Sequence, residues 1–135
     1  VRDAATSLRG AVAETSARTG FVDRSSPARL ALATAVESIE VVDLVGPSAR
    51  WVGATQEIAA TPDLAATREW ARALHRSFPS LRGLRWRGRQ AGSICFVLNE
   101  RTSIAALRAE DWPISEARLW PRVARAARDC RLAVV

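Results

Sequence analysis

Hydrophobic residues recur at helical spacing over three stretches of the chain. The strongest stretch follows Thr61-Pro62-Asp63, where a capping hydroxyl, a proline at the first helical position and an acid mark a helix start. Apolar positions then repeat every three to four residues as far as Phe78, where the next proline ends the pattern. Two further helices are expected, over Leu8–Arg18 and from Pro121 to about Cys130. The first of these two is capped by Thr6 or Ser7 and ended by Gly20.

Short apolar runs between these helices are typical of strands. The runs expected to form strands are Ile39–Leu44, Leu84–Trp86, Ile94–Leu98 and Leu132–Val135. Arg29–Val36 alternates imperfectly, so strand and helix both stay open there, and Asp111-Trp112-Pro113 is expected to be a break. This mixture predicts an α/β domain of the α+β class, with a mixed sheet and flanking helices.

Length and composition limit the class of protein. At 135 residues the chain is expected to form one domain, residues 1–135, around a single core. No apolar run approaches the ~20 residues that a membrane helix needs, so no membrane association is expected. The two cysteines fit no metal or disulfide framework, and the acids do not cluster at ligand spacing, so no metal is expected either. A reducing cytoplasm is the expected compartment.

The basic residues change this picture, because all 20 are arginine and the formal net charge is +6. Such a charge favours encounters with anions, for example nucleic acid, a phosphorylated cofactor or an acidic protein partner. Near the C-terminus, arginines fall three or four residues apart, so that most share one helical face: Arg118, Arg122, Arg125, Arg128 and Arg131. The face can contact phosphates. A solvated basic face is the preferred interpretation, since no helix-turn-helix or zinc-finger spacing accompanies it. Direct nucleic-acid binding is therefore not expected.

The loop Arg87–Ser93, between two expected strands, combines glycine with arginine. A ligand can approach the backbone closely at Gly88 and Gly92. Nearby arginines supply positive charge: Arg85, Arg87 and Arg89. The loop is therefore a candidate site for an anionic small molecule.

Two further residues were considered as catalytic groups. Glu14 lies on an otherwise apolar stretch of the first helix, so it is either an exposed helix acid or a carboxylate that points into a cleft. His75 is the single histidine and has no serine or cysteine in a nucleophile motif with it, so a surface position is the preferred interpretation.

Four short motifs in order resemble the RES domain, a family named for its Arg, Glu and Ser. An Ala-Leu-Ala-Glu helix corresponds to Gly10–Thr15, and a strand ending in Leu-Asp-Leu corresponds to Val42–Gly46. A helix after a Thr/Asp turn corresponds to Thr61–Phe78. An Asp-Gly-Ile-x-Tyr-x-Ser-Arg segment before an apolar strand corresponds to Arg82–Arg89, followed by Cys95–Leu98. The resemblance covers about residues 4–101.

This resemblance implies a fold similar to that of ADP-ribosyltransferases, built around an NAD cleft. It implies a toxin of a bacterial toxin–antitoxin system that is neutralised by an Xre-type antitoxin. Such a toxin cleaves the nicotinamide–ribose bond of NAD, as a glycohydrolase, a phosphorylase or an ADP-ribosyl transferase. By position, Glu14 is implied as the catalytic carboxylate, and Arg87, Gly88 and Arg89 as residues that bind NAD, here the substrate. A homo-oligomer is compatible with this family.

The sequence departs from the family pattern at three places. The family's Arg lies upstream of the first matched strand, so the domain is expected to lack the family's N-terminal segment. The family's Tyr falls at about Asp3, and Gly88 stands where the family has Ser, with Ser93 as a partial substitute five residues later. Two alternatives to an active toxin stay open: a catalytically impaired relative that acts as a binding partner, and a basic nucleic-acid-binding module.

Overall fold

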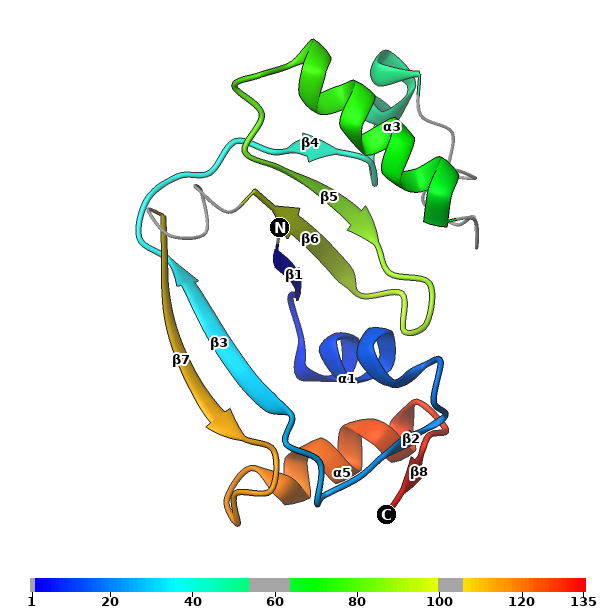
Figure 1. The fold of residues 1–135 in the computed structure, drawn as a ribbon, viewed down its shortest axis with the longest axis vertical. Coiled ribbons are helices and arrows are strands. Elements are labelled where there is room, and N and C mark those ends of the chain that lie inside the picture. The colour runs from blue at the N-terminus through cyan, green and yellow to red at the C-terminus, as the bar shows by residue number, and fades with distance from the viewer. Residues whose placement is uncertain (1, 54–63, 100–105) are drawn as a thin grey trace.

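The computed structural model describes residues 2–53, 64–99 and 106–135 (Figure 1). Its largest sheet has four strands in the spatial order β1 (Arg2–Ala5), β6 (Ile94–Leu98), β5 (Gly83–Arg87) and β4 (Val42–Asp43). Strand β6 runs antiparallel to both β1 and β5, whereas β4 runs parallel to β5. The sheet is therefore mixed, and the expected α+β class is confirmed.

Helices α1 (Leu8–Ser16) and α5 (Trp120–Asp129) pack against each other on one side of this sheet, in the lower half of Figure 1. Small side chains allow the close approach, since Ala13 is 2% exposed and Ala127 is 0% exposed. Short strands β2 (Phe21–Val22) and β8 (Ala133–Val134) pair in parallel beside the two helices. The main core gathers here, and its buried members are Val12, Val22, Ile114, Val123, Ala126 and Ala127.

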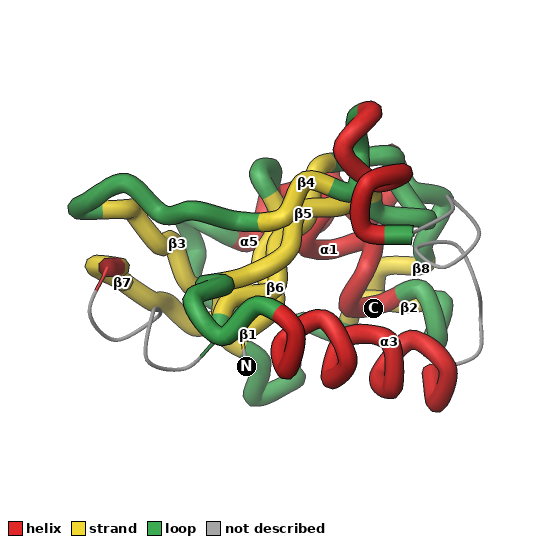
Figure 2. Tube along the Cα trace, turned by 90° about the horizontal axis from the view of Figure 1, so that it is seen from above, coloured by secondary structure: helices red, strands yellow, loops and turns green. Residues whose placement is uncertain are grey.

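A second, smaller core lies at the other end of the sheet. There the 3-10 helix η1 (Pro47–Val52) contacts β4, and α3 (Leu64–Ser77) and β5 each contribute a tryptophan. Leu44 and Ala49 are buried in it, and the partly buried Val42, Trp70 and Trp86 pack against them. Viewed from above, α3 runs along the outside of the molecule beside the sheet (Figure 2).

Strands β3 (Arg29–Ala35) and β7 (Leu107–Pro113) form an antiparallel two-stranded ribbon that projects from the rest of the molecule in both views (Figures 1 and 2). The ribbon settles the open question at residues 29–36 in favour of a strand. The expected break at Asp111–Pro113 is wrong, because Asp111 pairs with Ala31 in the ribbon, its carboxylate forms a salt bridge with Arg29, and the strand continues to Pro113. A proline is tolerated there since it occupies the last position of an edge strand.

Most other elements follow the sequence pattern. Ser7 caps α1, its hydroxyl accepting the N–H of Gly10, and α3 ends at Ser77 before Pro79. The expected strand Ile39–Leu44 is too long, because only Val42 and Asp43 pair. The register places Val42 opposite Leu84, and β5 begins only one residue earlier, so Ile39 and Glu40 would lie beyond the start of β5. The predicted helix start at Thr61-Pro62-Asp63 lies outside the described residues.

Candidate functional site

One face of α1 rests on the β5–β6 turn, which we define as Gly88–Ser93. Three residues of this face are three and four positions apart, so they lie one above another on the helix: Ser7, Gly10 and Glu14. The Ser7 and Ser93 hydroxyl oxygens are 3.2 Å apart. A Cβ atom placed on Gly10 would stand 2.6 Å from the Cβ of Ser93, so the helix approaches the turn here as closely as only glycine allows.

Glu14, four residues after Gly10 on α1, contacts the β5–β6 turn at Gln90. Its Oε1 accepts a hydrogen bond from the backbone N–H of Gln90 at 2.9 Å. Gly88 is buried directly beneath this contact, because a Cβ placed on it would stand 2.5 Å from Oε1 of Glu14. On its other side the same Cβ would stand 2.8 Å from Sγ of the buried Cys95. Glu14 and Gly88, which the sequence placed in separate motifs, are therefore neighbours.

Hydrogen bonds within the β5–β6 turn stabilise the segment that contacts Glu14. The N–H of Gly88 donates to the carbonyl of Ser93 at 2.7 Å, and the N–H of Gly92 donates to the carbonyl of Gly88 at 3.1 Å. Gly92 has a φ of 63°, a left-handed conformation that side chains disfavour. Arg87 adds a third tie, its Nη1 donating to the carbonyl of Gly92 at 3.0 Å. The backbone N–H of Gln90 is thus held by a closed turn.

The three arginines near the turn have different surroundings. Arg85 is directed toward β4, where its Nη1 donates to Oδ2 of Asp43 at 2.7 Å with both side chains about one-third exposed. Asp43 therefore compensates the positive charge of Arg85, which was expected to serve the loop. Arg87 and Arg89 are both exposed, at the end of β5 and in the turn respectively.

Ser93, the expected partial substitute for the family's Ser, does not contact the carboxylate of Glu14. The hydroxyl of Ser93 contacts that of Ser7, at the first turn of α1, whereas the hydrogen bond recorded for Glu14 in the described part of the chain comes from Gln90. Gln90 contributes through its backbone alone, so no residue-type pattern could have singled it out. Gly10 and Ser7 also escaped notice as site residues, although a glycine within a helix is a signal of close packing.

The remaining candidates lie apart from this contact. His75 is exposed on α3, as expected. Arg122, Arg125 and Arg128 are exposed on α5, opposite its buried alanines, as a solvated basic face would be. Arg131 follows the end of that helix with a φ of 59°, and so does not extend the face.

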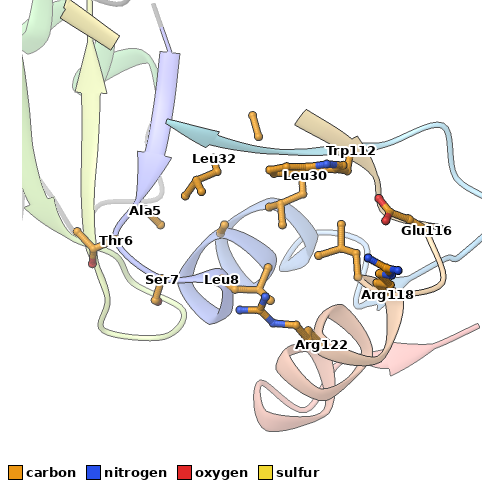
Figure 3. A pocket seen from close by; sticks show the side chains of 13 residues that line it. Ala5, Thr6, Ser7, Leu8, Leu30, Leu32, Trp112, Glu116, Arg118 and Arg122 are labelled. Atoms are coloured by element: carbon orange, nitrogen blue, oxygen red, sulfur yellow. The ribbon is translucent and has the colours of Figure 1, made fainter. Parts of the chain in front are cut away.

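A cavity of about 410 Å³ opens on another side of α1 (Figure 3). Its apolar wall comes from the start of α1, from β3 and from β7, including Leu8, Leu30 and Trp112. Arg118 and Arg122 lie at the rim near the start of α5. Neither Glu14 nor any residue of the β5–β6 turn lines it. This cavity is therefore distinct from the Glu14 contact.

Residues 2–53, 64–99 and 106–135, which the structure describes, hold neither a metal-binding cluster nor a membrane-spanning helix. Within those ranges, no three His, Cys, Asp or Glu side chains come together as a metal site would require. None of the helices described there has both the length and the apolar character needed to cross a bilayer.

Comparison with known proteins adds one finding. The family model of the RES domain matches residues 4–120. This match covers more than half of the chain and extends beyond residue 101, the limit set by the motifs. No curated protein and no solved structure matches the chain.

Proposed function

Because this chain belongs to the RES domain family, we propose that it cleaves the nicotinamide–ribose bond of NAD, with Glu14 as the catalytic carboxylate. The C–N bond breaks and its electron pair leaves with neutral nicotinamide. An acceptor oxygen, from water, phosphate or a protein side chain, forms the new bond to the ribose carbon, and an acceptor hydroxyl loses its proton. The reaction is a glycohydrolase, phosphorylase or ADP-ribosyl transfer reaction accordingly.

The chemistry calls for a carboxylate at the ribose. Loss of nicotinamide builds positive charge on the sugar, as in glycoside cleavage, and a nearby carboxylate lowers the energy of that cation. The same group can orient or deprotonate an acceptor hydroxyl. The observation that carries the proposal is that Glu14 Oε1 lies against the β5–β6 turn, at the backbone N–H of Gln90, and so is not a freely solvated helix acid.

We assign the diphosphate of NAD to Arg87, Gly88 and Arg89. Guanidinium groups bind phosphate oxygens by charge-assisted, often bidentate hydrogen bonds. Arg87 gives one N–H to Gly92 and, with five donors on a guanidinium, keeps others for a ligand. Gly88 carries no side chain, so it leaves the carboxylate of Glu14 in place beside the two arginines. A carboxylate, two guanidiniums and a glycine turn together fit a dinucleotide.

The family also supports a biological setting. We propose that the protein acts as the toxin of a bacterial toxin–antitoxin pair in the cytoplasm, with an Xre-type antitoxin as its partner. An inhibitor that covers the Glu14 contact would stop NAD loss without a change in the fold.

A catalytically impaired relative is the second candidate, and Gly88 favours it. Where the family has Ser, this chain has no hydroxyl, and the recorded partner of Glu14 within the described residues is a backbone N–H. Loss of a hydroxyl partner at such a site costs on the order of 10²–10³ in rate. Such a protein would bind NAD or its antitoxin without turnover.

The two candidates differ in nicotinamide release. Purified protein is incubated with NAD, and nicotinamide is measured by chromatography in parallel with Glu14→Gln and the matched control Glu110→Gln, an exposed acid on β7. The proposal expects release by the parent and by Glu110→Gln, and a decrease on the order of 10²–10³ in Glu14→Gln. Equal release by Glu14→Gln would remove Glu14 from the mechanism. No release by the parent at high protein concentration would leave the impaired relative as the answer.

A further inference from the structure

We infer that the β5–β6 turn positions the carboxylate of Glu14 through the backbone N–H of Gln90, and that Gly88 is the residue that makes room for this contact. The catalytic consequence rests on the function proposed above, whereas the contact itself does not. Gln90 is a positioning residue, because it acts on substrate chemistry only through Glu14, and Gly88 serves the same contact in addition to its proposed place at the diphosphate.

The first step is the hydrogen bond itself. Glu14 is on the exposed side of α1, where a glutamate normally samples many rotamers. The N–H of Gln90 selects one of these arrangements, with Oε1 held at 2.9 Å. A hydrogen bond to a charged acceptor is stronger than one between neutral groups, which favours this arrangement over the other rotamers. The donor stays in place because hydrogen bonds from Gly88, Gly92 and Arg87 close the turn.

The second step is the space above Gly88. A side chain at this position would meet Oε1 of Glu14 on one side and Sγ of Cys95 on the other. Cys95 is only 3% exposed and belongs to β6, so its thiol has no free volume to retreat into. The far end of Glu14 is the flexible partner. A side chain at residue 88 therefore displaces the carboxylate of Glu14, and its 2.8 Å approach to Sγ of Cys95 also strains the contact with β6.

The third step is the register of α1. The close contact of Gly10 with Ser93 lies one helical turn before Glu14 and fixes both the height and the rotation of the helix over the turn. The hydroxyl contact between Ser7 and Ser93 adds a second point at the start of the helix. The position of Glu14 at Gln90 therefore depends on the packing of α1 against the β5–β6 turn as well as on its own side-chain rotamer.

The contact is tested by hydrogen exchange at single amides, measured by NMR in the free protein. In Glu14→Ala, the N–H of Gln90 loses its acceptor, and we expect its exchange to accelerate about 10-fold or more. The N–H of Gly92, which donates within the turn, is the internal control and keeps its rate. Gly88→Ala should accelerate Gln90 in the same way. Unchanged exchange at Gln90 in Glu14→Ala would overturn the inference, even if Gly88→Ala proved too unstable to measure.

The catalytic consequence is tested by a double-mutant cycle on nicotinamide release. Gly88→Ala should lower kcat on the order of 10-fold, and should lower kcat no further in a Glu14→Gln background. A merely structural loss would lower the residual rate of Glu14→Gln as well, and would contradict the inference. Gly46→Ala is the matched control, since a Cβ there meets its nearest neighbour, Oδ2 of Asp43, at 3.4 Å, an ordinary contact.

These two tests separate the two proposals. Hydrogen exchange reports the contact whether or not the protein consumes NAD. Accelerated exchange without any NAD turnover would support the positioning role of Gln90 and reject the proposed activity. Turnover that depends on Glu14, together with unchanged exchange at Gln90, would do the reverse.

Discussion

The carboxylate of Glu14 accepts a hydrogen bond at 2.9 Å from the backbone N–H of Gln90, a residue 76 positions later in the chain. The contact joins the helix that follows β1 to the turn between β5 and β6. Since β1 pairs with β6 in the same sheet, the sheet itself brings both ends of the contact together. Four predictions follow from the elements that surround this contact.

Replacing Gly10 by alanine should destabilise the fold by about 1–3 kcal/mol, because its Cβ would stand 2.6 Å from the Cβ of Ser93. Neither carbon is the end of a flexible chain, so the helix itself has to move. Urea unfolding of Gly10→Ala measures the loss, and Gly46→Ala serves as the control with ordinary space around the new methyl group. If Gly10→Ala were as stable as the control, α1 would not be packed against the turn as described.

Replacing Ser7 by alanine should cost about 1 kcal/mol, because the N–H of Gly10 loses its capping hydroxyl. The contact with the hydroxyl of Ser93 is lost at the same time. Thermal unfolding followed by circular dichroism measures the shift in Tm. Ser115→Ala, an exposed serine outside the helices and strands, is the control and should leave Tm unchanged; equal shifts in both variants would argue against the cap.

Replacing Arg87 by glutamine should weaken NAD binding about 10-fold, because a charge-assisted hydrogen bond to a phosphate contributes about 1.5–3 kcal/mol. The effect should appear in KM more than in kcat, and in the Kd where turnover is absent. Arg125→Gln, an exposed arginine on α5, removes the same charge far from the turn and is the control. An equal loss in both variants would mean that only the net charge matters.

Replacing Asp43 by asparagine should destabilise the fold by at most about 1 kcal/mol, because the ion pair with Arg85 is partly exposed and screened by solvent. Asparagine retains the oxygen that accepts the N–H of Val45, so the turn after β4 is preserved. The difference from the parent should shrink at 1 M salt in urea unfolding. A difference that did not depend on salt would show that packing, not charge, is responsible.

Several elements could be predicted from short stretches of sequence. The cap at Ser7, the strand Ile94–Leu98 and the end of α3 before Pro79 all depend on interactions between residues close along the chain. The prediction failed where pairing decided the outcome. Ile39–Val41 has a strand-like pattern but does not pair with β5. Asp111 has a turn-like composition but pairs with Ala31 in the ribbon and forms a salt bridge with Arg29.

The candidate site divides in the same way. Residue types and motif order were sufficient to select Glu14 and the loop at Gly88 and to suggest the RES domain family, because those features are chemical and local. They left open whether Glu14 faces water or a cleft, since small apolar residues precede it on the helix and no polar face marks a direction. In the folded chain Glu14 is exposed, and one of its carboxylate oxygens accepts the N–H of Gln90. The close contact of Gly10 with Ser93 fixes the rotation of α1, and this rotation places Glu14 beside the N–H of Gln90.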